Sequence, residues 1–132
     1  SGLCWLILPE RLWFILIHAP HIMVMIAILY PLIQVIPQEI VYRALFFERY
    51  GPLFPNQPTA VFANAVLFSF GHLMYWHPVV WIATFIGSFI FAQAYLKPRG
   101  FLQACALHGA AGVAIFASGL GWLFFSGGAV SQ

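Results

Sequence analysis

The stretch Gln38-Glu39-Ile40-Val41-Tyr42-Arg43 places an amide, a carboxylate, a phenol and a guanidinium in a chain that is otherwise almost entirely apolar. Polar groups are costly in hydrocarbon, so they usually face a bundle interior or a wet cavity and often mark function. The three stretches of this kind therefore predict a membrane protein with a polar site among its helices. The other two are Phe68-Ser69-Phe70-Gly71-His72 and His108-Gly109-Ala110-Ala111-Gly112.

The composition of the chain indicates a membrane protein. Of its 132 residues, 63% are hydrophobic and 6% are charged, and the mean hydropathy is +0.93. A soluble domain carries about 25% charged residues, so we expect an all-α integral membrane protein with a single domain over residues 1–132. The net charge of +2 is too small and too scattered to indicate nucleic acid as a partner. Cys4 and Cys105 lie in apolar stretches and predict neither a disulfide nor a metal site.

Hydropathy and proline positions predict a bundle of about five transmembrane helices, because a spanning helix needs about 20 apolar residues. Pro31 and Pro37 frame an irregular stretch between the first two helices, since proline removes a backbone donor and disfavours helix before it. No signal peptide is predicted, and residues 1–8 are expected to be the tail of an earlier helix. The five predicted segments are Leu12–Tyr30, Pro37–Phe47, Thr59–Trp76, Val79–Leu96 and Phe101–Phe125.

The basic residues predict an orientation for this layout. Arg11, Arg49, Lys97 and Arg99 all fall on one side of it, and the loops of the other side carry no Lys or Arg. Basic loops tend to face the cytoplasm. We therefore expect these loops to be cytoplasmic and the C-terminus to lie outside.

Small residues recur every four positions in the last segment, at Ala106, Ala110, Ala114 and Ser118. Small side chains at this spacing let helix backbones approach closely. The stripe predicts the packing face of this helix, with a lipid-facing stripe as the alternative.

Glu39 and Arg43 are four residues apart on the second predicted helix, so they share a face and can pair. This spacing favours a buried pair that stabilises the helix, and a catalytic carboxylate is the alternative. Gln38 lies about 100° round the helix from Glu39 and shares its stripe with Tyr42. One stripe therefore holds an ion pair, and the next holds an amide beside a phenol.

Two histidines on other helices complete the set of polar groups. His72 lies near the end of the third predicted segment, and His108 lies inside the fifth. We expect the second, third and fifth helices to bring these imidazoles to the amide and carboxylate around one polar cavity. The other histidines, His18, His21 and His77, are interpreted as interfacial or structural.

The order Glu-Glu-x-x-x-Arg, Phe-x-x-x-His and His-x-x-x-Asn on successive transmembrane helices marks the CPBP family of CAAX-processing and bacteriocin-processing intramembrane proteases. From about residue 31 to residue 122 this chain resembles the family core, and residues 1–30 are expected to form a preceding helix. The resemblance implies an enzyme of the bacterial inner membrane that cleaves a membrane protein or peptide without a cofactor. The residues that match the motifs are Glu39, Arg43, Phe68, His72 and His108.

The chain departs from the family pattern at two positions. The first Glu of the pair is thought to activate water with the second-motif histidine, but Gln38 stands there and an amide cannot act as a general base. Gly112 replaces an Asn that is thought to stabilise the oxyanion with the third-motif histidine, and losing one such donor costs about 10²–10³ in rate. Some bacterial members also have Pro-Gln-Glu and a third-motif glycine, so a natural variant and an engineered Glu→Gln trap both remain open.

Three functions follow from these residues. A working endopeptidase would activate water with Glu39 or His72, while His108 polarises the peptide carbonyl. An inactive relative would use the same cavity to bind a partner membrane protein or a lipid-like ligand, as a subunit of a larger membrane complex. A metal-dependent protease would use His72, His108 and Glu39 as ligands, and it ranks last because no His-Glu-x-x-His motif is present.

Overall fold

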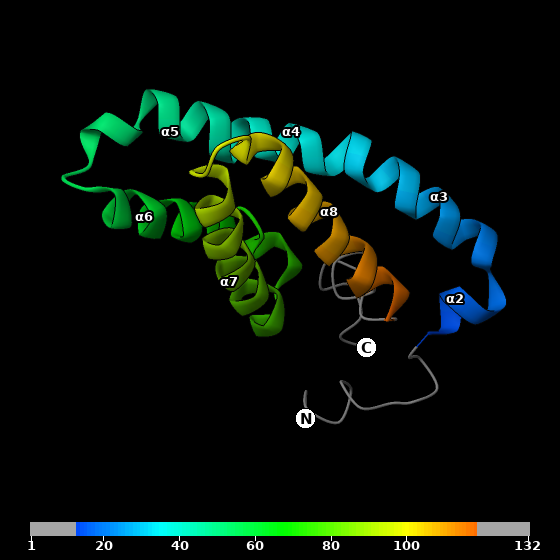
Figure 1. Ribbon diagram of the computed structural model, residues 1–132. Helices are drawn as coiled ribbons and strands as arrows, with labels where there is room; N and C mark the ends of the chain where they lie inside the picture. The colour runs from blue at the N-terminus through cyan, green and yellow to red at the C-terminus, as the bar shows by residue number, and fades with distance from the viewer. Residues whose placement is uncertain (1–12, 119–132) are drawn as a thin grey trace.

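The computed structural model describes residues 13–118, which form helices joined by short turns with no strand among them (Figure 1). The expectations for residues 1–8 and for the end of the last predicted segment lie outside this range. In chain order the elements are α2 (Phe14–His18), α3 (Pro20–Tyr30), the π-helical η1 (Pro31–Val35), α4 (Ile36–Glu39), the π-helical η2 (Ile40–Leu45), α5 (Phe46–Arg49), the 3₁₀ turn η3 (Gly51–Leu53), α6 (Gln57–Phe70), the 3₁₀ turn η4 (Leu73–Tyr75), α7 (Pro78–Tyr95) and α8 (Gly100–Ala117).

Three helices in the described range are long and apolar enough to cross a membrane: Pro20–Arg49, Pro78–Tyr95 and Gly100–Ala117. The predicted all-α membrane class is therefore confirmed. The described range contains fewer spans than the five predicted segments, for two reasons. Part of the first segment and the second segment form one helix, and the third is too short.

Residues 20–30 of the first predicted segment join the second segment in one continuous helical rod of 30 residues, Pro20–Arg49, which runs along the top of the molecule in Figure 1. The first segment is not one helix as predicted, because the backbone leaves the helical conformation at Ala19, between α2 and α3.

The predicted irregular stretch between Pro31 and Pro37 is wrong, because η1 and α4 carry the helix through both prolines. The backbone N–H of Ile36 bonds to the carbonyl of Pro31, five residues back. In such a π-helical turn the backbone N–H bonds five residues back instead of four. This shift in hydrogen-bond partners lets the helix continue although the prolines lack an N–H donor.

The third predicted segment, Thr59–Trp76, is shorter as a helix than expected. α6 has 14 residues and spans about 21 Å, less than the roughly 30 Å of a hydrocarbon core. It starts after Asn56, whose side chain accepts a hydrogen bond from the backbone N–H of Thr59 at 3.0 Å. It ends at Phe70, so His72 lies just beyond the helix rather than in its last turn.

α7 and α8 form a helical hairpin, and each helix starts one residue before its predicted start. α6 packs on α7, α7 packs on α8, and the rod contacts α8 through α3 and α4 (Figure 1). His77, interpreted from the sequence as interfacial or structural, caps α7 by accepting a hydrogen bond from the backbone N–H of Val79 at 3.2 Å.

The packing face of α8 differs from the predicted one. Ala106, Ala110 and Ala114 are exposed, whereas the buried residues of this helix include Ala104, His108 and Gly112. The two stripes have the same four-residue period and are offset by two positions, which is about 200° around a helix. Periodicity alone could not choose between them, because both stripes consist mainly of small residues. The predicted packing face is therefore wrong for the described range.

Gly100 permits the tight connection between α7 and α8. A Cβ atom at this position would overlap the backbone carbonyl of Tyr95, which cannot rotate away as a flexible side chain would. We expect Gly100→Ala to destabilise the protein by about 1–3 kcal/mol or more through overpacking. Thermal unfolding in detergent checks this, with Gly51→Ala as the matched control, because a Cβ at Gly51 meets nothing within 4 Å. Equal unfolding temperatures for the two variants would contradict the expectation.

Candidate active site

Glu39 is the centre of a buried polar cluster that joins the rod to α8. Its side chain is fully buried at the end of α4. Carboxylate Oε1 lies 2.8 Å from Nδ1 of His108, and Oε2 lies 3.4 Å from Nε of Arg43. An ionised carboxylate can only accept, so Nδ1–H of His108 is the donor. This hydrogen bond leaves Nε2 of His108 as the ring nitrogen available for other contacts.

Arg43 is also fully buried and is covered by aromatic rings from two other helices. Its Cζ lies 4.8 Å from the ring centre of Phe68 on α6 and 5.8 Å from that of Phe91 on α7. Its terminal nitrogens Nη1 and Nη2 have no hydrogen-bond partner within residues 13–118. The positive charge is therefore compensated by the neighbouring carboxylate and by the faces of the aromatic rings.

His72 is fixed by the helix that precedes it. Nδ1 lies 2.6 Å from the backbone carbonyl oxygen of Phe68, and because a carbonyl only accepts, Nδ1–H donates. Nε2 of His72 then carries the free lone pair. The Phe68 ring lies 4.7 Å from the ring centre of His72 and 5.6 Å from that of His108, and Tyr75 stacks on His72 at 5.9 Å. The two imidazoles that the sequence assigns to one cavity thus contact the same phenyl ring.

Gln38 and Tyr42 lie on the stripe next to this ion pair. Gln38 is half-buried, and its side-chain oxygen is buried without a hydrogen-bond partner in the described part of the chain. The Tyr42 ring meets Phe68 edge-on at 5.1 Å. A Cβ atom at Gly71 would overlap the Tyr42 hydroxyl, so this phenol ends beside the residue that precedes His72.

Gly112 lies one turn beyond His108 on the buried face of α8. A Cβ atom at this position would overlap the ring and the hydroxyl of Tyr30, at the end of α3. A side chain larger than hydrogen would therefore displace that phenol. The space that an Asn side chain would need at position 112 is occupied by Tyr30.

Three further residues shape the site and were not identified from the sequence. Phe91 stacks on His108 at 4.7 Å with an interplanar angle of 14°, the Asn64 side-chain amide donates to the backbone carbonyl of Tyr42, and Tyr30 packs on α8. Asn64 carried a signal, since it is an amide in an apolar helix two turns before His72. Tyr30 and Phe91 carried none, because aromatic residues are common in every predicted segment.

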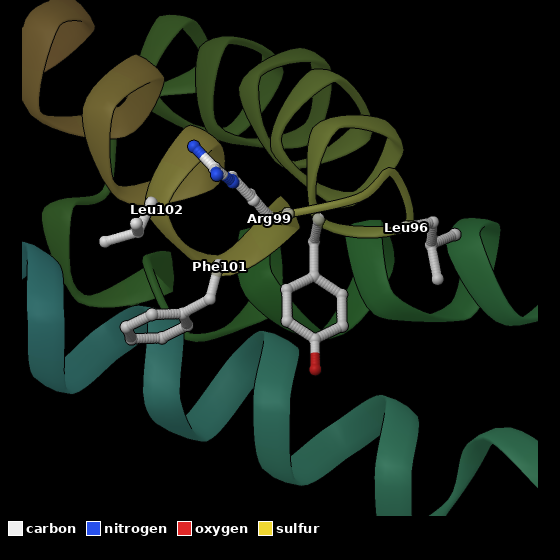
Figure 2. A pocket seen from close by; sticks show the side chains of 6 residues that line it. Leu96, Arg99, Phe101 and Leu102 are labelled. Atoms are coloured by element: carbon white, nitrogen blue, oxygen red, sulfur yellow. The ribbon is translucent and has the colours of Figure 1, made fainter.

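The metal-dependent alternative lacks an assembled donor set in the described range. No group of three or more His, Cys, Asp or Glu side chains there is arranged to hold a metal ion. A separate pocket opens at the turn between α7 and α8, where Figure 2 shows Leu96, Arg99, Phe101 and Leu102 around it. None of the residues that line it belongs to the cluster around Glu39.

Comparison with known proteins identifies a family. Residues 20–114 match a protein family described as type II CAAX prenyl endopeptidase Rce1-like. The matched region runs from the start of α3 almost to the end of α8, so it contains every residue of the cluster described above. No curated protein sequence and no solved structure matches the chain.

Proposed function

Because the chain belongs to the Rce1-like family of type II CAAX prenyl endopeptidases, which are proteases, we propose that it is an intramembrane endopeptidase acting at the cluster around Glu39. The observation that carries the proposal is the 2.8 Å hydrogen bond from His108 to Glu39 across two helices. A purely structural ion pair would need only Arg43. The bond to His108 additionally fixes the orientation of an imidazole, which is a usual requirement of acid–base and electrostatic catalysis.

The two histidines take different roles because their Nδ1 atoms face different acceptors. His72 donates to a neutral carbonyl, so its Nε2 acts as the base that accepts a proton from water. His108 donates to a carboxylate, which stabilises positive charge on that ring. In the charged ring Nε2–H is also a donor, so His108 polarises the carbonyl oxygen of the peptide through this N–H group. Glu39 is a positioning residue in this scheme, since both of its oxygens already face His108 and Arg43.

The proposed reaction is hydrolysis of a peptide bond by water. The water oxygen bonds to the carbonyl carbon while one water proton moves to Nε2 of His72, and the carbonyl electron pair moves onto oxygen. When the carbonyl re-forms, the C–N bond breaks and the leaving amine takes the proton from His72. The buried side-chain oxygen of Gln38 can accept a hydrogen bond from this water, which orients the water without deprotonating it.

We propose a hydrophobic or lipid-modified segment of a membrane protein as the substrate, because the site lies among apolar helices and must be reached from the bilayer. The protein would reside in a bacterial inner membrane. Arg11 precedes the rod and Arg49 ends it, so a rod that crosses the membrane once separates these two residues, and the predicted common side of the four basic residues is not retained. No cofactor is needed for the steps above.

Reconstitution of the full chain in phosphatidylethanolamine–phosphatidylglycerol vesicles tests this function. The probes are a prenylated C-terminal peptide and an unmodified hydrophobic peptide, and His72→Ala provides the background. We expect slow cleavage by the unmutated chain, and about 10²-fold faster cleavage by Gln38→Glu, because a carboxylate can accept the proton that an amide cannot. Inactivity of all three forms, with stable co-purification of one membrane protein, would instead support the inactive partner-binding subunit.

A further inference from the structure

Tyr30 lies along the face of α8 that carries His108. Its ring meets His108 edge-on at 6.5 Å and Phe116 edge-on at 5.6 Å, and the end of its phenol lies over Gly112. These three α8 residues are spaced by four, so they form one stripe that the phenol covers. The glycine between the two larger residues provides the space for the phenol.

The Tyr30 hydroxyl forms no hydrogen bond with residues 13–118, although its side chain is half-buried. Buried phenols usually find a partner for their O–H group. Among the described residues this donor is unused, and it lies over Gly112, one helical turn beyond His108. The phenol ring lies 6.5 Å from the imidazole that is proposed to polarise the peptide carbonyl, where the proposed reaction produces a negatively charged oxygen.

Resting on the proposed function, we propose that Tyr30 is a catalytic residue whose O–H donates a hydrogen bond to the oxygen of the scissile carbonyl, beside Nε2 of His108. A tetrahedral intermediate needs donors placed where its charge develops. With Gly112 in place of a side-chain donor on α8, the phenol from α3 supplies that donor across the helix interface. Gly112 then has a definite role, which is to let the phenol reach the site.

The test is Tyr30→Phe in the vesicle assay, because this change keeps the ring against Gly112 and Phe116 and removes only the donor. We expect kcat to fall about 10²–10³-fold with little change in KM and an unchanged unfolding temperature. The matched control is Tyr95→Phe at the far end of α7, where the Tyr95 ring stacks on Phe47 with 5.6 Å between ring centres. This change also removes a phenol hydroxyl and keeps the ring. The control is expected to retain the rate of the unmutated chain.

Gly112→Ala provides a second variant that leaves the donor in place but displaces it. We expect it to lower kcat as Tyr30→Phe does, and the double variant to be no slower than either single one, because both changes remove the same interaction. If the unmutated chain cleaves its probe and Tyr30→Phe cleaves it equally fast, the role of Tyr30 is overturned and the proposed protease function stands. Additive losses in the double variant would also overturn it.

Binding of a phosphinate peptide, whose tetrahedral oxygens imitate the intermediate, tests the donor without turnover. We expect the unmutated chain to bind this peptide at least about tenfold more tightly than Tyr30→Phe, since the interaction is specific to the tetrahedral state. Equal affinities would overturn the role of Tyr30 whether or not cleavage is seen. An unmutated chain that neither cleaves the peptides nor binds the phosphinate would overturn the proposed function together with this role.

Discussion

His72→Ala is expected to lower the rate of peptide cleavage by about 10²–10⁴-fold, the usual contribution of a positioned general base. The imidazole is held by the carbonyl of Phe68 with its other nitrogen free, and an alanine cannot accept a proton from water. His72 is half-buried and lies outside α6, so the loss should appear in kcat and leave the unfolding temperature nearly unchanged.

His21→Ala is the matched control for this variant. His21 is an exposed histidine near the start of the rod, far along the same helix from Glu39, and its loss should leave cleavage unaffected. A His72→Ala chain that cleaves as fast as the His21→Ala chain would show that another group activates the water.

Arg43→Ala should destabilise the protein by about 3–5 kcal/mol, the usual cost of leaving one member of a buried ion pair without its partner. Both side chains of the pair are fully buried, and Glu39 would keep only its bond to His108. Removal of the guanidinium would also leave the space between Phe68 and Phe91 unfilled. Expression level and urea unfolding in detergent micelles measure the effect.

Two further variants make this experiment decisive. Arg49→Ala removes an exposed guanidinium from the end of the same rod and should change stability little. The double change Glu39→Gln with Arg43→Met removes both charges and should recover much of the stability, because the cost lies in the unpaired charge. If Arg43→Ala unfolded at the same urea concentration as Arg49→Ala, the stabilising role of the pair would be wrong.

The helical class and the position of α7 could be predicted from hydropathy. The course of the helix through the prolines and the buried face of α8 could not. The ends of α7 were predicted within one residue because polar and proline-rich stretches flank it. The continuity of the rod through Pro31 and Pro37 could not be predicted, because proline indicates a break and the wide turns that absorb it have no sequence signature. The buried face of α8 could not be predicted either, because two stripes of small residues with the same four-residue spacing were both possible packing faces.

For the candidate site, the polar residues could be predicted and their partners could not. Glu39 and Arg43 are neighbours by helix geometry alone, so their pairing follows from spacing. The contact of Glu39 with His108 joins residues 69 apart in the chain, and only the packing of the rod on α8 reveals it. The same packing places Tyr30 over Gly112, a relation that neither residue indicates in the sequence.

The intrahelical pairing of Glu39 with Arg43 has a consequence for the order in which the protein enters the membrane. The rings that cover Arg43 and the imidazole that binds Glu39 come from α6, α7 and α8, which are all synthesised after the rod. A lone charge in mid-bilayer is costly, but two opposite charges within one helix compensate each other before any later helix arrives. The rod can thus insert as an electrically neutral segment, and its charged groups recruit their remaining partners as the rest of the chain follows.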